Sequence, residues 1–178
     1  MSKTTHWLTV AGLLSVALFS GSVKAADARA VIIDTEGNEV GRVELMAAPT
    51  GTLLRLELDG LSPGAKAIHI HSVGNCADPS EGFLASGGHI NPDGQAHGLM
   101  NPEGPDAGDL PNFYVHDDGY AWAEFFTTKA SLDGSIGAKI LDDDGAALVI
   151  HTNVDDHSTQ PIGGAGARVA CGIIQVLN

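Results

Sequence analysis

The sequence has few basic and few aromatic side chains, and each shortage excludes a class of protein. Of 178 residues, 9 are Lys or Arg against 22 Asp or Glu, for a formal net charge of −13. Nucleic-acid binding and docking on anionic lipid both need basic surfaces, so both are excluded. Aromatics make up 5%, and no segment shows a convincing apolar period of 3.6 residues, which argues against a helical bundle.

The N-terminal apolar run, residues 8–20, is shorter than the roughly 20 residues of a membrane-spanning helix. Lys3 precedes it, and small residues lead up to Ala25, as in a secretory signal. We expect a signal peptide over 1–25 that is removed, a mature domain over 26–178, a periplasmic or secreted location and no membrane association after cleavage. An uncleaved membrane anchor is the alternative.

Cysteine is also scarce, with Cys76 and Cys171 as the whole complement. An exported chain meets an oxidising compartment, where a single disulfide between them is the default expectation. The alternative is a pair of unpaired buried thiols.

Glycine is abundant, at 23 residues, and turn residues separate segments of alternating apolar and polar side chains. This period of two predicts about eight antiparallel strands, at Ala28–Asp34, Val40–Met46, Leu53–Leu58, Ala67–Ser72, Asn112–His116, Tyr120–Thr127, Ala146–His151 and Val169–Leu177. Residues 132–141 are a weaker candidate for a short helix, because they contain glycines. We therefore predict an all-β fold, an antiparallel barrel or sandwich, with long functional loops over 73–111 and 152–167.

The histidines gather in particular segments. His69 and His71 are two apart on a predicted strand, so their side chains share a face. Such a pair suits copper or zinc, although two surface histidines would give the same pattern. The first long loop adds nitrogen and oxygen donors at His89, His97, Asp106 and Asp109. These side chains are candidate zinc ligands, and the alternative is that they are solvated loop residues. His151 ends a strand, and for His116 and His157 we expect surface exposure.

In their order and spacing, several short motifs resemble the copper/zinc superoxide dismutases of the bacterial secreted type. The motifs are Ile68-His69-Ile70-His71, Gly74-Asn75-Cys76, Gly87-Gly88-His89-Ile90-Asn91-Pro92, His97-Gly98, Gly108-Asp109-Leu110-Pro111-Asn112, Val149-Ile150-His151 and Gly164-Ala165-Gly166-Ala167-Arg168-Val169-Ala170-Cys171-Gly172. The resemblance spans the chain from about Ala28 to the end. It implies an eight-stranded Greek-key β-barrel with two long loops.

The resemblance also implies two metal sites. Copper would bind His69, His71, His89 and His151, and zinc would bind His89, His97, Asp109 and the residue at 106. His89 would bridge the metals and carry a proton to the product, and Arg168 would attract the substrate anion over the copper. Asp155 falls where a carboxylate links ligands of both metals, and Cys76 and Cys171 match the family disulfide.

Asp106 departs from the family pattern, which has a third zinc histidine at this position. Carboxylate oxygen binds zinc, but the side chain is shorter and adds a negative charge. One interpretation is a zinc site of altered affinity, and the other is a weak or empty site that leaves a copper-dominated enzyme. We expect an occupied but weaker site.

The implied activity is disproportionation of superoxide to oxygen and hydrogen peroxide by copper cycling between Cu(II) and Cu(I), as antioxidant defence outside the cytoplasm. The partners would be superoxide and the two metals, in a monomer or homodimer. The alternative is a copper-binding or buffering protein on the same scaffold, with little turnover.

Overall fold

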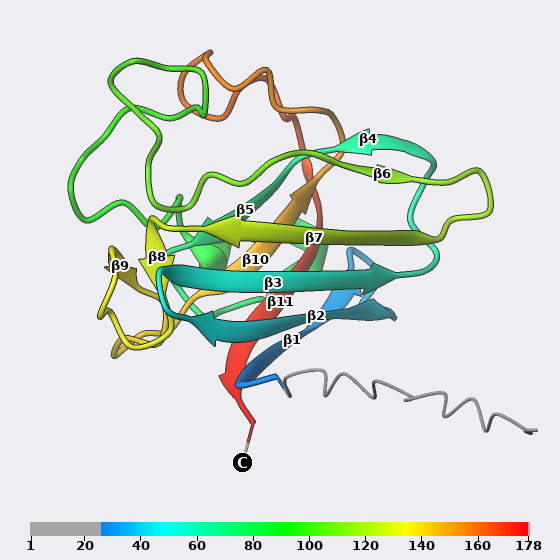
Figure 1. The fold of residues 1–178 in the computed structure, drawn as a ribbon. Helices are drawn as coiled ribbons and strands as arrows, with labels where there is room; N and C mark the ends of the chain where they lie inside the picture. The colour runs from blue at the N-terminus through cyan, green and yellow to red at the C-terminus, as the bar shows by residue number, and fades with distance from the viewer. Residues whose placement is uncertain (1–25, 178) are drawn as a thin grey trace, which may run out of the picture.

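The computed structural model describes residues 26–177, which form a curled antiparallel sheet of seven strands in the order β5-β10-β11-β1-β2-β3-β7 (Figure 1). The predicted signal peptide over 1–25 lies outside the described residues. The strands of this sheet are β1 (Ala28–Asp34), β2 (Glu39–Ala48), β3 (Gly51–Leu58), β5 (Ile68–His71), β7 (Ala121–Thr127), β10 (Ala147–His151) and β11 (Arg168–Val176). The all-β antiparallel prediction is confirmed.

A short strand pair joins the two edges of the curled sheet. β4 (Gly64–Lys66) precedes the edge strand β5 along the chain, β6 (Phe113–Val115) precedes the opposite edge strand β7, and β4 pairs with β6. The ladder is thus a half-barrel with a two-stranded bridge rather than one continuous ring of eight strands. A third pair, β8 (Ala130–Ser131) with β9 (Ala138–Lys139), is parallel, so the described residues contain eleven strands in all.

The core fills the concave side of the sheet with alternate residues of its strands. In β3, Leu54, Leu56 and Leu58 are at most 1% exposed, whereas their neighbours Arg55 and Glu57 are half-buried. This is the period of two that the sequence shows, and it determines which side chains of each strand face the core and which face away from it.

The short helix considered for residues 132–141 is wrong. Gly134 and Gly137 both have positive φ, at 78° and 61°, so the chain turns twice before it reaches β9. A side chain at Gly137 would also collide with the Lys129 carbonyl, so the turn depends on glycine there.

Both long loops lie at the end of the sheet away from the two ends of the described residues (Figure 1). Residues 73–111 contain two 3₁₀ turns, η1 (Pro79–Glu81) and η2 (Leu84–Ser86), and residues 152–167 follow β10. Within residues 26–177 no helix has the length and apolar character needed to cross a membrane.

Candidate metal centre

The edge strand β5 presents its free side to the first long loop. The Ile70 N–H donates to the Gly108 carbonyl and its carbonyl accepts from Ile90, both at 2.9 Å. Isolated bridges pair His69 with Asp109 and His71 with His89. This backbone pairing brings loop donors next to the two strand histidines, which explains how residues far apart in sequence form one site.

Each of the four histidines expected to bind copper has one ring nitrogen held by an oxygen. His69 Nε2 donates to Asp155 Oδ2 at 3.0 Å, and His71 Nδ1 donates to the Gly87 carbonyl at 2.9 Å. Similarly, His89 Nδ1 donates to Asp106 Oδ2 at 2.9 Å, and His151 Nδ1 donates to the Gly166 carbonyl at 3.1 Å. These bonds fix which nitrogen of each ring carries the hydrogen.

The opposite nitrogens of these rings are buried and have no hydrogen-bond partner: His69 Nδ1, His71 Nε2, His89 Nε2 and His151 Nε2. The ligand atoms of His69, His71 and His151 lie within 4.8 Å of one another, and the His89 ring centroid is 4.1 Å from that of His69. A buried nitrogen lone pair without a partner is costly unless a ligand satisfies it. Four buried nitrogens without partners in one cluster fit a copper ion.

Burial sets the protonation of two of these rings. Burial lowers the pKa of His71 to about 2, with the charge on His89 adding to the effect, and it lowers the pKa of His151 to about 4. Both rings are therefore neutral at physiological pH, which is the form that binds metal.

A second group of donors, next to the first, contains His89, His97, Asp106 and Asp109, with ligand atoms within 4.8 Å of one another. His97 Nδ1 lies 2.5 Å from Asp109 Oδ1, and neither atom has a hydrogen-bond partner. Nitrogen and carboxylate oxygen in a buried four-residue cluster fit zinc.

Asp106 is buried in this group, and both its oxygens are engaged. Oδ2 accepts from His89 Nδ1 at 2.9 Å, and Oδ1 accepts from the Gly108 N–H at 2.9 Å. Burial opposes protonation of His89, but its hydrogen bond to Asp106 and its ion pair with Asp109 outweigh burial and raise the pKa of His89 to about 9, so copper binding at Nε2 of the metal-free protein displaces a proton.

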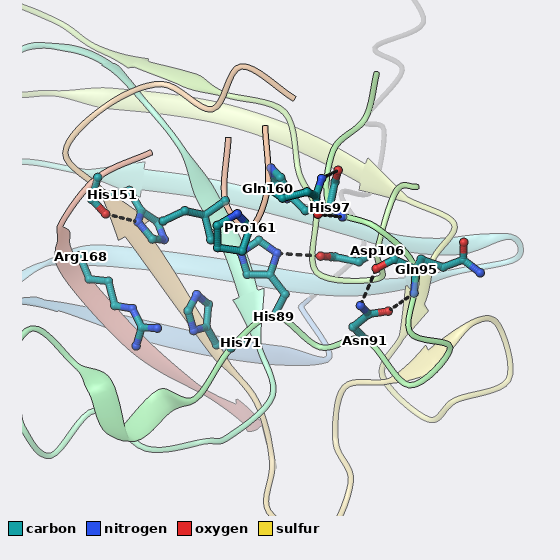
Figure 2. Close-up of a pocket in the computed structure, with 13 residues that line it drawn as sticks. His71, His89, Asn91, Gln95, His97, Asp106, His151, Gln160, Pro161 and Arg168 are labelled. Atoms are coloured by element: carbon teal, nitrogen blue, oxygen red, sulfur yellow. Dashed lines mark hydrogen bonds and ion pairs between the residues drawn. The ribbon is translucent and has the colours of Figure 1, made fainter. Parts of the chain in front are cut away.

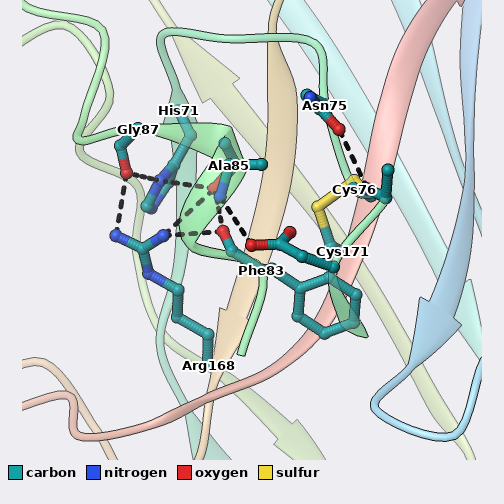
Figure 3. The surroundings of a disulfide bond; sticks show 11 residues. His71, Asn75, Cys76, Phe83, Ala85, Gly87, Arg168 and Cys171 are labelled. Atoms are coloured by element: carbon teal, nitrogen blue, oxygen red, sulfur yellow. Dashed lines mark hydrogen bonds between the residues drawn. A yellow bond between two sulfur atoms is a disulfide. The ribbon is translucent and has the colours of Figure 1, made fainter. Parts of the chain in front are cut away.

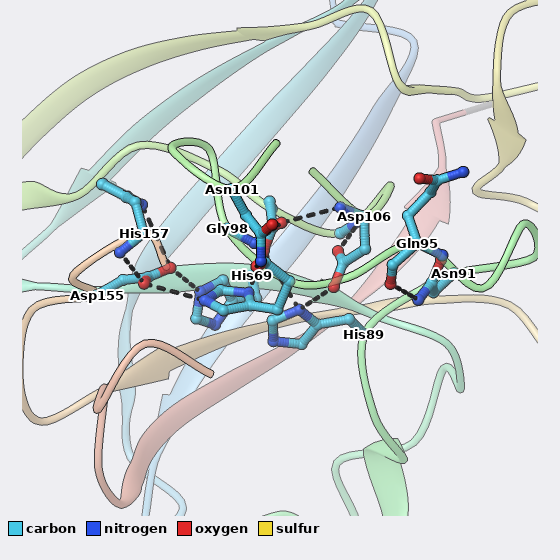
Figure 4. A network of polar contacts seen from close by, with 12 residues as sticks. His69, His89, Asn91, Gln95, Gly98, Asn101, Asp106, Asp155 and His157 are labelled. Carbon is cyan, nitrogen blue, oxygen red and sulfur yellow. Dashed lines mark hydrogen bonds and ion pairs between the residues drawn. The ribbon is translucent and has the colours of Figure 1, made fainter. Parts of the chain in front are cut away.

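Asp155 connects the two donor groups, as Figure 4 shows. Its Oδ2 accepts from His69 Nε2 and its Oδ1 accepts from His97 Nε2, both at 3.0 Å. Asn112 holds the Asp155 backbone on both sides, at 2.8 and 2.9 Å. His157, expected on the surface, is instead half-buried, and its N–H donates to Asp155 Oδ1 at 2.6 Å. His116 is exposed as expected.

A cavity of about 400 Å³ opens over the first donor group (Figure 2). His71, His89 and His151 line it together with Arg168, which is the one Lys or Arg among its described lining residues. The cavity therefore offers a single fixed positive side chain beside the histidine cluster.

Three groups of the first loop hold the Arg168 guanidinium (Figure 3). Nη1 donates to the Phe83 carbonyl at 2.8 Å and to Ser86 Oγ at 3.2 Å, and Nη2 donates to the Gly87 carbonyl at 2.8 Å. The Gly87 carbonyl also accepts from His71, so the arginine and a histidine of the cluster share one anchor.

The disulfide between Cys76 and Cys171 is confirmed, with a Cα–Cα distance of 5.8 Å. It attaches the start of the first loop to β11, the strand that begins with Arg168. With Phe83 and Val149 the two cysteines form a small apolar cluster separate from the main core. The bond thus anchors the loop segment whose carbonyls hold the arginine.

Comparison with known proteins places the chain in a family. The family profile described as copper/zinc superoxide dismutase matches residues 39–174. The superoxide dismutase [Cu-Zn] of Caulobacter vibrioides is 48% identical over 150 residues, covering 83% of this chain and 85% of the relative. The chain belongs to the copper/zinc superoxide dismutase family.

Solved structures agree with this assignment. A Cu/Zn superoxide dismutase from Brucella abortus matches with a TM-score of 0.65 and 30% identity, covering 82% of this chain and 98% of that one. A superoxide dismutase-like protein from Bacillus subtilis matches with a TM-score of 0.76 and 36% identity, covering 82% and 96%. Copper and zinc are the metals that the family implies, and the two donor groups offer suitable atoms for both.

All the site residues expected from the sequence come together, although Asp106 contacts His89 as a hydrogen-bond acceptor. Sequence reasoning missed the groups that hold Arg168, because backbone carbonyls such as those of Phe83 and Gly87 leave no side-chain signal. It also gave no role to Asn112, although this residue ends one of the quoted motifs.

Proposed function

We propose that this protein is a superoxide dismutase that converts two superoxide anions and two protons to oxygen and hydrogen peroxide. The observation that carries the proposal is the cavity in which three histidines of the first donor group, each with a ring nitrogen that has no hydrogen-bond partner, lie beside one anchored arginine. A copper-binding protein needs the histidines, whereas the arginine is useful for an anionic substrate.

When bound, copper would supply the one-electron exchange with the substrate. Arg168 attracts the anion and orients it, and its three hydrogen bonds to the loop hold the charge in place before the substrate arrives. His89 lines the same cavity, and its Nε2 would hold a proton for the peroxide product. Asp155 keeps His69 in its ligating orientation.

The second donor group would hold zinc next to His89, at a carboxylate-rich site with Asp106 in place of a histidine. The protein would act outside the cytoplasm, in the periplasm or secreted, as residues 26–178 after loss of 1–25. Its disulfide suits an oxidising compartment. Every donor of the site comes from one chain, which is compatible with a monomer or a homodimer.

The test is the superoxide decay rate of the mature protein loaded with copper, with and without zinc. Rapid decay is expected, and it should fall steeply in Arg168→Ala while copper affinity stays close to that of the wild type. If the protein binds copper without accelerating superoxide decay, and Arg168→Ala leaves copper binding unchanged, the copper-buffering alternative is established instead.

A further inference from the structure

Asp106 occupies the position from which a zinc ligand would be expected, yet its contacts are those of a carboxylate that orients a histidine. We propose that Asp106 is a positioning residue that holds His89 ready for copper when the neighbouring zinc site is empty. The inference rests on the proposed copper site and concerns how that site is completed.

The first support is a matched pair of contacts. Asp155 Oδ2 accepts from His69 at 3.0 Å, and Asp106 Oδ2 accepts from His89 at 2.9 Å. In both cases the far nitrogen of the ring is buried without a partner. A carboxylate on the outer nitrogen of a metal-binding histidine fixes the ring orientation and increases its basicity as a ligand. Asp106 therefore orients the His89 ring in the same way that Asp155 orients the His69 ring.

The second support is that groups of the loop itself hold Asp106 in this position. Its Oδ1 accepts the Gly108 N–H at 2.9 Å, and its own N–H donates to Asp109 Oδ2 at 3.0 Å. The side chains of His89 and Asp106 are 6% and 4% exposed, so water competes little for their hydrogen bond. Groups of the loop itself thus support the contact between Asp106 and His89.

The third support is that the contact of Asp106 with His89 completes the set of hydrogen bonds that orient the histidines of the first donor group. With it, all four histidines of the group have one nitrogen anchored and the other free. The family's histidine at this position is a zinc ligand and carries no carboxylate, so it cannot pair with His89 in this way. The substitution at 106 thereby replaces dependence on zinc with a contact inside the chain.

The test compares zinc-free proteins that carry one equivalent of copper. In the Cu(I) form of the wild type, proton NMR should show a slowly exchanging His89 Nδ1–H, which disappears when zinc is added because zinc replaces that hydrogen. Asp106→Ala should lose the signal, and competition with a chelator should show roughly 10- to 100-fold weaker copper binding. Saturating zinc should restore copper affinity in Asp106→Ala, which a merely misfolded variant would not do.

Asp93→Ala is the matched control, since it removes an exposed carboxylate from the same loop. It should leave the His89 signal and copper affinity unchanged. If Asp106→Ala does not fold, Asp106→Asn keeps the size but leaves one acceptor oxygen for two donors, and copper affinity should again fall. Wild-type copper affinity in zinc-free Asp106→Ala or Asp106→Asn would overturn the proposal.

Superoxide decay is measured on the same samples to separate this inference from the proposed function. Copper binding and NMR signals as expected, without turnover, would refute the dismutase and leave the role of Asp106 standing. Superoxide turnover together with an unchanged His89 Nδ1–H signal in Asp106→Ala would support the dismutase function and refute the role of Asp106.

Discussion

At the scale of single residues, the site is defined by which nitrogen of each histidine is already committed. Backbone carbonyls of Gly87 and Gly166 fix His71 and His151, while carboxylates fix His69 and His89. The carbonyl-bound rings have sharply lowered pKa values, whereas the contact with Asp106 helps to raise that of His89. Neighbouring imidazoles thereby acquire different proton affinities in one cluster.

Restoring the family histidine should strengthen the second donor group. In Asp106→His a third imidazole would join His89, His97 and Asp109, and one negative charge would be removed. We expect zinc to bind more tightly, by on the order of tenfold, as judged by competition with a chromogenic chelator. Equal or weaker zinc binding would show that Asp106 is not a deficient ligand.

Residue types at fixed spacing made most of the site predictable. Ligand side chains such as His69, His71 and Asp109 stand in distinctive motifs because metals demand particular donors. The geometry around Asp106 was not predictable, because the sequence cannot show that its two oxygens are taken by Gly108 and His89.

At the scale of elements, the second long loop acts as a support for Asp155. Residues 152–167 bring the Asp155 carboxylate between His69 and His97, and Gly163 packs directly against that carboxylate. A Cβ at Gly163 would collide with Asp155 Oδ1, so no side chain fits there without displacing the carboxylate. The loop is thus shaped around Asp155.

Gly163→Ala should disturb both donor groups through Asp155. Gly164→Ala is its control, because Gly164 has a similar positive φ, 70° against 60°, but a methyl group there would meet no atom within 4 Å. Both variants carry the strain of a positive φ, about 1 kcal/mol. Only Gly163→Ala should also weaken copper and zinc binding in chelator competition, and equal metal affinity in the two variants would contradict this.

The strands were predictable because one face of each packs on the core, which imposes the period of two. β1 matches its predicted range, Ala28–Asp34, and the other seven predicted strands differ only at their ends. The short strands β4, β8 and β9 were missed, since a pattern of alternation cannot register in two or three residues. The turns at Gly134 and Gly137 lie between β8 and β9.

At the scale of the whole molecule, an acidic protein presents a cavity whose one fixed cation is Arg168 among the described lining residues. The other polar lining groups outside the metal donors are neutral, namely Asn91, Gln95 and Gln160. Steering of an anion by distant charges is therefore weak, and capture depends on the field close to the site.

The superoxide decay rate should accordingly fall only weakly as salt is added, because screening acts most on distant charges. The measurement is the second-order rate constant of the copper-loaded protein from low to physiological ionic strength. A steep fall would reveal a positive funnel formed by residues outside the cavity lining.

The metal-free protein should be most stable near pH 6.5. Below that pH His71 and His151 are protonated in the unfolded chain, whereas in the folded protein they stay neutral down to about pH 2 and 4. The free energy of unfolding therefore decreases as the pH falls. Above that pH, folded His89 keeps its proton up to about pH 9, so stability falls with base. Each group contributes a slope of about 1.4 kcal/mol per pH unit. Denaturant unfolding of the metal-free protein across this range is the measurement, and stability that rises steadily to pH 9 would contradict it.

The pairing of Ala28 with Val176 sets the two ends of the described chain side by side, far from the loops that form the metal centre. The order in which the strands are connected is therefore separable from the architecture of the site. A short linker could join the ends, and new ends could open between β6 and β7 at the turn residues Asp117 and Asp118, which are exposed. Such a circular permutant would keep every donor in place, and fusion partners or surface tethers attached beside Ala28 or Val176 would leave the cavity mouth clear.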